Sequence, residues 1–244
     1  MKPRRPSPLS RIVFASALAL LGGATVGCSN DPPANTGSPS AAKGSPPMKE
    51  YAATSDDRLG KLADGTGIPV GSAIPAAHAL DLDGKDVALA TLVAKGPILI
   101  IVYRGGWCPY CNFEIHSFTQ AYPDFQKRHV TPVAISVDRP ESAAKTQATY
   151  SIPFPVLSDS NALVLDAFHV VKHVDDAELA KLKGYGIDLE AASGNAHHVI
   201  AIPALFIVDR SGIVRWAHSD PTYTVRPTIS QILAAIDASG MKSD

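Results

Sequence analysis

The stretch PILIIVYRGGWCPYC, residues 97–111, decides the fold. Its first seven residues are apolar and mostly β-branched or aliphatic, which is typical of a strand buried on both faces. The letters RGG indicate a turn. After Cys111, the segment NFEIHSFTQAYPDFQKR has a helical pattern of apolar residues that Pro123 interrupts. The sequence therefore predicts a strand, a turn, a Cys-x-x-Cys pair and a helix, in that order.

The predicted order places Cys108 at the N-terminus of a helix. Free backbone N–H groups and the positive end of the helix dipole favour a thiolate there, so we expect a lowered pKa for Cys108. Pro109 suits the first helical turn. Arg104 either adds positive charge or is an exposed turn residue. Cys111 lies one turn further on, where it can attack a mixed disulfide or a sulfenic acid on Cys108.

The cysteine count limits what this pair can be, because the chain has only one other cysteine. A zinc site needs four ligands, and the His197-His198 pair fits no common zinc spacing. A c-type haem would need histidine where the chain has Asn112. A disulfide that closes so short a loop would stabilise the fold little. We therefore favour a reactive dithiol that forms a Cys108–Cys111 redox disulfide, and we expect no metal and no cofactor.

The N-terminus has the pattern of an export signal. Residues 1–27 hold four basic residues and then the apolar run IVFASALALLGGATV, which is short for a membrane span. The ending TVGC resembles the lipobox of bacterial lipoproteins, which implies that Cys28 is lipidated after cleavage. An ordinary signal peptide with a stray cysteine is the alternative. We therefore expect a cell-envelope protein that is held at the membrane by its lipid and faces the periplasm or the cell exterior.

The remaining chain divides into a linker and one domain. Residues 28–50 are rich in Ser and Pro and predict a flexible, lipid-anchored tether. Residues 51–244 are long enough for one folded domain. The whole chain has 244 residues, is 45% hydrophobic and has a formal net charge of −1. This charge gives no reason to expect a nucleic acid as a partner.

Further strand and helix patterns fill that domain. The segment VTPVAISVD predicts a buried strand parallel to the first, and ALFIVD with IVRW predicts a hairpin. PESAAKTQATY, SNALVLDAF and PTISQILAAIDAS predict helices, whereas VDDAELAKLKGYGIDLEAASGNAHH predicts a charged helical insertion near the site. The domain is therefore expected to be α/β, with a central mixed β-sheet flanked by helices. Pro203, after Ile202, opens the hairpin, where a proline can be cis.

This arrangement resembles the thioredoxin superfamily. There the corresponding proline is cis, packs against the Cys-x-x-Cys pair and leaves neighbouring backbone groups free to bind an extended substrate. The resemblance implies that Ile202 and Pro203 bind substrate. It also implies that Trp107 packs beside the motif and shields it from water.

A finer resemblance is to the alkyl hydroperoxide reductase/thiol-specific antioxidant family, the peroxiredoxins and their relatives. The segments VGSAIPAAHALDLDGKDVALATL, VYRGGWCPYCNFEI, VAISVDRPESA, FPVLSDSNALVLDAFHV and SDPTYTVRPTISQIL carry it in order, from about residue 71 to 236. The chain looks most like the peroxiredoxin-like subgroup with WCPYC. Where peroxiredoxins have P-x-x-x-T-x-x-C, this chain has Ile101 and Gly105, and the family's arginine falls about where Pro203 stands.

Three functions remain open from the sequence. The first is a peroxiredoxin-like antioxidant peroxidase, in which Cys108 attacks a peroxide, Cys111 resolves the product and an external thioredoxin-like thiol donor resets the pair. The second is an extracytoplasmic thiol-disulfide reductase or oxidase of thioredoxin type that acts on protein disulfides. The third is an anchored domain that keeps the fold without catalysis. We favour the first, because its resemblance spans the domain.

Overall fold

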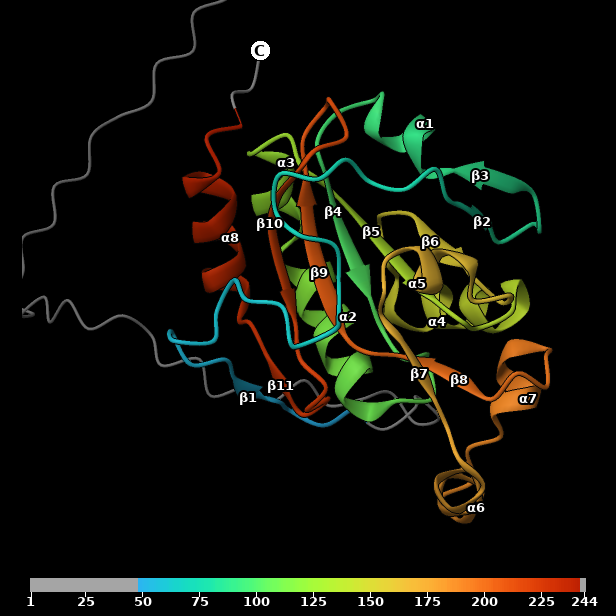
Figure 1. Ribbon diagram of the computed structural model, residues 1–244. Helices are drawn as coiled ribbons and strands as arrows, with labels where there is room; N and C mark the ends of the chain where they lie inside the picture. Colours follow the sequence, from blue (N-terminus) through green and yellow to red (C-terminus); the bar gives the residue numbers. More distant parts are fainter. Residues whose placement is uncertain (1–47, 242–244) are drawn as a thin grey trace, which may run out of the picture. The chain divides into compact units, whose positions relative to one another are not determined.

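The computed structural model describes residues 48–241. The predicted signal peptide, Cys28 and most of the predicted linker lie outside them. A seven-stranded mixed sheet forms the centre of the domain, in the order β10-β9-β4-β5-β6-β2-β3 (Figure 1). In chain order its strands are β2 (His78–Leu80), β3 (Asp86–Ala88), β4 (Ile98–Val102), β5 (Thr131–Ser136), β6 (Val156–Ser158), β9 (Ala204–Val208) and β10 (Val214–Ser219).

The strand pairing confirms the predicted centre of the sheet. β4 pairs parallel with β5, as the two buried apolar runs predicted, and β5 pairs parallel with β6. β9 runs antiparallel to β4 and forms the predicted hairpin with β10. The sheet is therefore mixed, with its parallel strands in the middle and antiparallel strands at both edges.

Helices cover both faces of this sheet. Ile98 and Ile100 of β4 join a core cluster that also contains residues of α1 and α5, whereas Leu99 and Ile101 join a cluster with residues of α2, α3, α4 and α8. No β4 side chain is more than 1% exposed, and burying each such side chain stabilises the fold by about 1.5–3 kcal/mol. The helices are α1 (Leu89–Val93), α2 (Pro109–Gln120), α3 (Tyr122–Gln126), α4 (Pro140–Tyr150), α5 (Leu163–Ala167) and α8 (Ile229–Ala238).

The predicted insertion, residues 174–198, forms a small unit at one end of the sheet together with the two strands that flank it. Its strands β7 (Val171–His173) and β8 (Val199–Ala201) pair antiparallel, and α6 (Asp176–Gly184) and α7 (Leu189–Ser193) lie between them in the chain. Figure 1 shows α6 projecting away from the sheet. A satellite cluster of Val174, Leu182, Leu189 and Ile200 holds this unit together.

The N-terminal end of the described chain packs onto the domain. β1 (Ala52–Ala53) pairs parallel with β11 (Val225–Arg226), and the Lys49 N–H donates to the Pro109 carbonyl at 3.1 Å. The last residues of the predicted linker are therefore part of the folded unit, because this hydrogen bond and β1 hold them. Between residues 48 and 241, no helix has the length and apolar character needed to cross a bilayer.

Candidate active site

The two thiols lie at the start of α2, as predicted. Cys108 is the N-cap residue, with an extended backbone (φ −89°, ψ 114°), and Pro109 is the first helical residue. The Cys108 sulfur accepts the Cys111 N–H at 3.4 Å, so it occupies the place of an oxygen cap. The Cys111 thiol donates to the same sulfur at 2.7 Å. Both cysteines are free thiols, and their sulfurs are positioned to form a bond with each other.

The surroundings of Cys108 stabilise its thiolate. Its pKa is lowered to about 6, chiefly because the Cys111 thiol donates a hydrogen bond to the sulfur. The Arg104 charge, the Cys111 N–H and the Arg226 charge lower this pKa further, against the effect of burial. Burial and the hydrogen bond to Cys108 raise the pKa of Cys111 instead. The pair therefore holds one thiolate and one thiol, as a nucleophile and a resolving group require.

Arg104 is a buried cation beside Cys108. Only 6% of the residue is exposed, and its guanidinium carbon lies 4.2 Å from the centroid of the Tyr223 ring and 5.0 Å from that of the Trp107 ring. Within residues 48–241, its guanidinium has no hydrogen-bond acceptor and no carboxylate partner. Two aromatic rings therefore hold the Arg104 guanidinium in place, and its N–H donors are unused. Arg104 and Cys108 both line the same cleft, which is described next.

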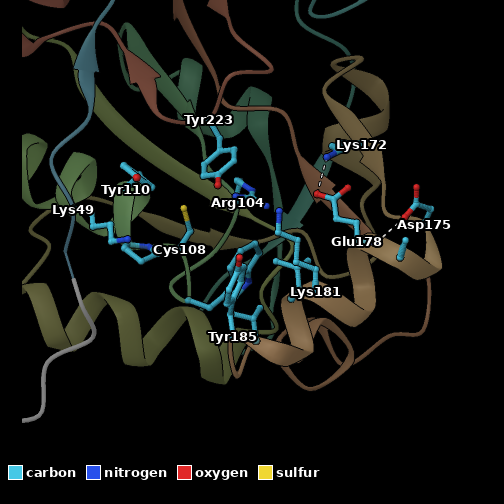
Figure 2. Close-up of a pocket in the computed structure, with 15 residues that line it drawn as sticks. Lys49, Arg104, Cys108, Tyr110, Lys172, Asp175, Glu178, Lys181, Tyr185 and Tyr223 are labelled. Carbon is cyan, nitrogen blue, oxygen red and sulfur yellow. Dashed lines mark hydrogen bonds and ion pairs between the residues drawn. The ribbon is translucent and has the colours of Figure 1, made fainter.

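A cleft of about 910 Å³ opens over Cys108. One wall is the turn before α2 together with the N-terminal segment, and the other is α6 of the insertion, as Figure 2 shows. The predicted insertion therefore does lie at the thiol pair. The cleft is lined by Lys49, Arg104, Trp107, Cys108, Pro109, Tyr110, Lys172, Asp175, Ala177, Glu178, Lys181, Leu182, Tyr185, Ile187 and Tyr223.

A buried ion pair lies behind Cys111. Arg226 Nη1 is 2.9 Å from Glu114 Oε2, and Arg226 Nη2 is 3.6 Å from the Cys111 sulfur. Burial raises the pKa of Glu114 to about 7, against the effect of Arg226. The sequence analysis missed both residues. Glu114 was detectable as a charged residue next to the apolar stripe of α2, but nothing in the sequence connects Arg226 with it.

The turn before Cys108 is held by Asp138 and Asn112. Asp138 Oδ2 accepts the Gly106 N–H at 2.7 Å, and Asn112 Nδ2 donates to the Gly106 carbonyl at 2.9 Å. A Cβ at Gly106 would stand 2.0 Å from Thr146 Oγ1, so only glycine fits. Burial raises the pKa of Asp138 to about 6. Trp107, the next residue, packs against the core cluster that contains both cysteines.

The structure does not support the predicted environment of Ile202 and Pro203. Every peptide bond between residues 48 and 241 is trans, so the predicted cis-proline is wrong; trans is the lower-energy form for a residue before proline. The Ile202 N–H donates to the Val170 carbonyl at 2.7 Å, and the Pro203 carbonyl accepts the Asp220 N–H at 3.2 Å. These backbone groups are therefore already paired within the domain.

The paired histidines of the insertion do not reach the thiols. His197 Nε2 lies 2.9 Å from the Ser160 carbonyl, and His198 Nε2 lies 2.6 Å from the Glu190 carboxylate. Neither lines the cleft at Cys108. They belong to the loop that leads into β8, so no proton transfer at Cys108 is assigned to them.

The fold and the thiol pair define a thiol oxidoreductase, and comparison with known proteins gives its family. The profile of the AhpC/TSA family matches residues 70–217, which are more than half of the chain. The chain therefore belongs to the AhpC/TSA family. This confirms the predicted resemblance to that family and, with the solved structures of similar fold, the predicted thioredoxin-like α/β fold.

The relatives of the chain include peroxiredoxins and thiol-disulfide oxidoreductases. A peroxiredoxin of Thermoplasma volcanium is 29% identical over 161 residues, which are 59% of this chain and 68% of that protein. The thiol-disulfide oxidoreductase ResA of Bacillus cereus is 29% identical over 112 residues, which are 46% of this chain and 64% of that protein, less than two thirds of its length.

Solved structures show the same fold. The crystal structure of peroxidoxin BcpB from Mycobacterium tuberculosis is 19% identical and has a TM-score of 0.55, covering 71% of this chain and 98% of that one. At this level of identity the likeness concerns the fold alone. The chemistry must therefore be argued from the residues around Cys108 and Cys111.

Proposed function

We propose that the chain is a peroxiredoxin-like peroxidase in which Cys108 attacks a peroxide and Cys111 resolves the product. One observation carries this proposal. The Cys108 sulfur has a pKa of about 6 and lines a cleft in which the Arg104 guanidinium has unused N–H donors. A thiolate next to a fixed cation is suited to attack a peroxide oxygen, because the cation stabilises the negative charge that develops on the leaving oxygen.

The first step forms one bond and breaks one. The Cys108 thiolate attacks the terminal oxygen of ROOH, an S–O bond forms and the O–O bond breaks. The leaving RO⁻ takes up a proton and departs as ROH, while Cys108 becomes a sulfenic acid. Arg104 replaces the family's arginine here, from a position four residues before Cys108. Its place between two rings keeps its donors oriented, although Gly105 stands where the family has threonine.

The second step uses the short distance between the sulfurs. Cys111 attacks the Cys108 sulfenic acid, an S–S bond forms, and water leaves with the Cys111 proton and the sulfenic hydroxyl. The 2.7 Å contact of the reduced pair means that little movement is needed. An external dithiol donor then reduces the disulfide, and its own thiols become oxidised. The cycle consumes one peroxide and two electrons from the donor.

Thiol-disulfide exchange on protein substrates is the second candidate. The likeness to ResA and the adjacent thiols favour it. In the thioredoxin arrangement, however, the substrate pairs with backbone groups before the proline. Here the Ile202 N–H and the Pro203 carbonyl already have partners within the domain. We therefore rank peroxide reduction first.

Stopped-flow oxidation of the reduced domain, residues 48–244, distinguishes peroxide reduction from thiol-disulfide exchange. Hydrogen peroxide is mixed with the domain, and tryptophan fluorescence is recorded, since Trp107 packs near Cys108. We expect a rate constant far above that of a free thiolate. A rate no better than that of a free thiolate, together with rapid reduction of a protein disulfide by the same domain, would establish the second candidate instead.

We also propose a location in the cell envelope. The proposal rests on the signal pattern of residues 1–27 and on the TVGC sequence that ends at Cys28. Metabolic labelling of the full chain with a radioactive or clickable fatty acid tests it, with Cys28→Ala as the control. Label that persists in this variant would contradict lipidation at Cys28.

A further inference from the structure

Arg226, the cation beside the Cys111 sulfur, stands on a strand that has one partner. Among the strands between residues 48 and 241, β11 pairs only with β1, and each of the two strands is two residues long. A two-stranded sheet of this size is marginally stable by itself. The place of Arg226 therefore depends on how β1 is held, and β1 lies at the opposite end of the described chain.

The backbone of β1 is bonded to the segment that carries Arg226. The Ala52 N–H donates to the Thr224 carbonyl at 2.9 Å, and the Thr54 N–H donates to the Arg226 carbonyl at 2.8 Å. Gln231 Nε2 of α8 donates to the Thr54 carbonyl at 2.9 Å, and Thr54 is 2% exposed. These hydrogen bonds hold β1 against the C-terminal part of the domain.

The residues before β1 are held on α2, the helix that carries the thiols. The Lys49 N–H donates to the Pro109 carbonyl at 3.1 Å. The rings of Tyr51 and Phe113 meet edge to face, with 5.4 Å between their centroids, an arrangement that aromatic pairs prefer. The chain just before β1 is therefore fixed to the first two turns of α2.

Residues 49–54 thus form a strap between the two elements that supply the buried ion pair. Glu114 comes from α2 and Arg226 from β11, and Figure 1 shows β1 beside β11. Burial raises the pKa of Tyr51, and the Glu114 charge raises it further, so this ring of the strap lies close to the ion pair. Arg226 Nε and Nη2 also donate to the Tyr223 carbonyl at 3.2 and 3.1 Å, which ties the guanidinium to the backbone of its own segment. A shift of β11 would therefore move the guanidinium.

We propose that the strap is a positioning element: it keeps the Arg226 guanidinium at the Cys111 sulfur, and Arg226 in turn assists the reaction of the thiol pair. Arg226 Nη2 lies 3.6 Å from that sulfur. A cation at this distance favours the thiolate form of a cysteine. The inference rests on the proposed function, because it concerns the same thiol cycle, and it adds the segment that positions Arg226.

The effect falls on the reductive half of the cycle. A donor thiolate attacks the Cys108 sulfur of the disulfide, a mixed disulfide forms, and the S–S bond to Cys111 breaks. Cys111 leaves with the electron pair as a thiolate, which the Arg226 charge stabilises. The second donor thiol then attacks the mixed disulfide, releases the Cys108 thiolate and passes its proton to Cys111. Loss of the strap's hold on β11 should therefore slow the reduction of the disulfide.

Two proline substitutions in β1 form a matched pair, because Ala52 and Ala53 are both exposed alanines. Ala52→Pro removes the N–H that donates to the Thr224 carbonyl. Successive N–H groups of a strand point in opposite directions, so the Ala53 N–H points away from β11 and Ala53→Pro keeps this hydrogen bond. Each variant of the full chain is oxidised and then reduced with dithiothreitol in a stopped-flow instrument, and tryptophan fluorescence is recorded.

Ala52→Pro is expected to slow the reduction by dithiothreitol about three- to tenfold, since tenfold corresponds to one pKa unit of thiolate stabilisation. The midpoint of Cys108 alkylation should also move upward by roughly half a pH unit, because the Arg226 charge adds to the lowering of that pKa by the Cys111 hydrogen bond. Ala53→Pro should match the wild type in both measurements. A purely structural role would lower the stability of the fold without moving this midpoint.

A second background tests whether the strap acts through Arg226. In Glu114→Gln/Arg226→Met, Ala52→Pro should have no more effect than Ala53→Pro, because the guanidinium is already absent. Tyr51→Leu weakens the contact of the strap with α2 without introducing a proline. It should shift the reduction rate and the alkylation midpoint in the same directions as Ala52→Pro.

The outcomes separate the strap from the peroxidase. Equal behaviour of Ala52→Pro and Ala53→Pro, or an equal effect of Ala52→Pro with and without Arg226, would overturn the positioning role. Wild-type behaviour of Tyr51→Leu would overturn it if Ala52→Pro failed to fold. In these cases, rapid oxidation of the wild type by hydrogen peroxide would still uphold the peroxidase. Slow oxidation by hydrogen peroxide, with reduction slowed by Ala52→Pro, would overturn the proposed function and leave the role of the strap in thiol exchange.

Discussion

Arg226 and Glu114 form a buried ion pair next to the Cys111 thiol, with 2.9 Å between Nη1 and Oε2. Their side chains are 3% and 1% exposed, and the second guanidinium nitrogen lies 3.6 Å from the Cys111 sulfur. One partner comes from α2 and the other from β11, which are far apart in the sequence. The pair thus connects the helix that carries the thiols to the C-terminal part of the domain.

Breaking this pair on one side should be costly. Glu114→Gln leaves the Arg226 charge buried without a counter-charge, which is expected to lower the free energy of unfolding by about 3–5 kcal/mol. The double variant Glu114→Gln/Arg226→Met should regain part of that loss, because no unpaired charge then remains. Urea unfolding of the reduced domain measures both, at a pH well above 7, because Glu114 has a pKa of about 7 and must be ionised to pair with Arg226. Equal stability of the single variant and the wild type would show that the pair contributes nothing.

The reaction of Cys108 should follow the ionisation of a thiol with a pKa of about 6. Since this pKa is lowered, the thiolate is already present at neutral pH and is lost as the pH falls through 6. The rate of alkylation by iodoacetamide should therefore be level above pH 7 and fall about tenfold for each pH unit below 6. In Cys111→Ala, which removes the donated hydrogen bond, the midpoint should move upward. A midpoint near pH 9 in the wild type would contradict this prediction.

Removing the guanidinium at position 104 should affect the first step. Arg104→Met keeps apolar packing between the rings of Tyr223 and Trp107 but removes the charge. We expect a higher pKa for Cys108 and a loss of about tenfold or more in the rate with hydrogen peroxide. Tyr223→Phe keeps the ring on which the guanidinium lies, so it should react at the wild-type rate. If Arg104→Met reacted normally, the cleft cation would have no part in peroxide activation.

Cys111→Ser should stop the cycle after the first step. With hydrogen peroxide, the variant should accumulate a sulfenic acid on Cys108, detected as a dimedone adduct by mass spectrometry. Cys108→Ser should give neither an adduct nor peroxide consumption. Under the alternative function, Cys111→Ser would instead trap mixed disulfides with protein substrates, and finding these without any dimedone adduct would favour that alternative.

Asp138 should make stability depend on pH. Burial raises its pKa from 3.8 to about 6, so the folded state favours the protonated form. The protonated Asp138 therefore contributes to the free energy of unfolding at low pH. This contribution, on the order of 2–3 kcal/mol, is lost as the pH rises through 6. In Asp138→Asn this part of the decline should be absent, whereas the exposed control Asp83→Asn should keep it. Unfolding free energies at pH 4, 5, 6 and 7 give the comparison.

The local elements were predictable because their signals are contained in short segments. The apolar run that became β4 is buried along its whole length, and Pro109 begins a helix with Cys108 as its N-cap. These features depend on neighbours in the chain. The hairpin of β9 and β10 was predictable for the same reason, since its turn lies between two adjacent apolar runs.

Contacts between segments that are distant in the sequence could not be predicted from it. The Ile202 N–H is paired with the Val170 carbonyl and the Pro203 carbonyl with the Asp220 N–H, and no local pattern connects these residues. The place of Arg226 could not be predicted for a similar reason. Arg226 reaches Glu114 and the Cys111 sulfur because the folded chain brings β11 next to α2, which is distant in the sequence.

The sequence by itself determined the family, the strand–thiol–helix order and the place of the two cysteines at the start of a helix, because helix start signals and buried strands are encoded within a few neighbouring residues. The tertiary structure decided which charges face which sulfur. Arg104 faces the cleft between two aromatic rings, Arg226 lies with Glu114 behind Cys111, and α6 closes the far side of the cleft. Electrostatic effects depend on distance and burial in space, and these are fixed only when the sheet brings distant segments together.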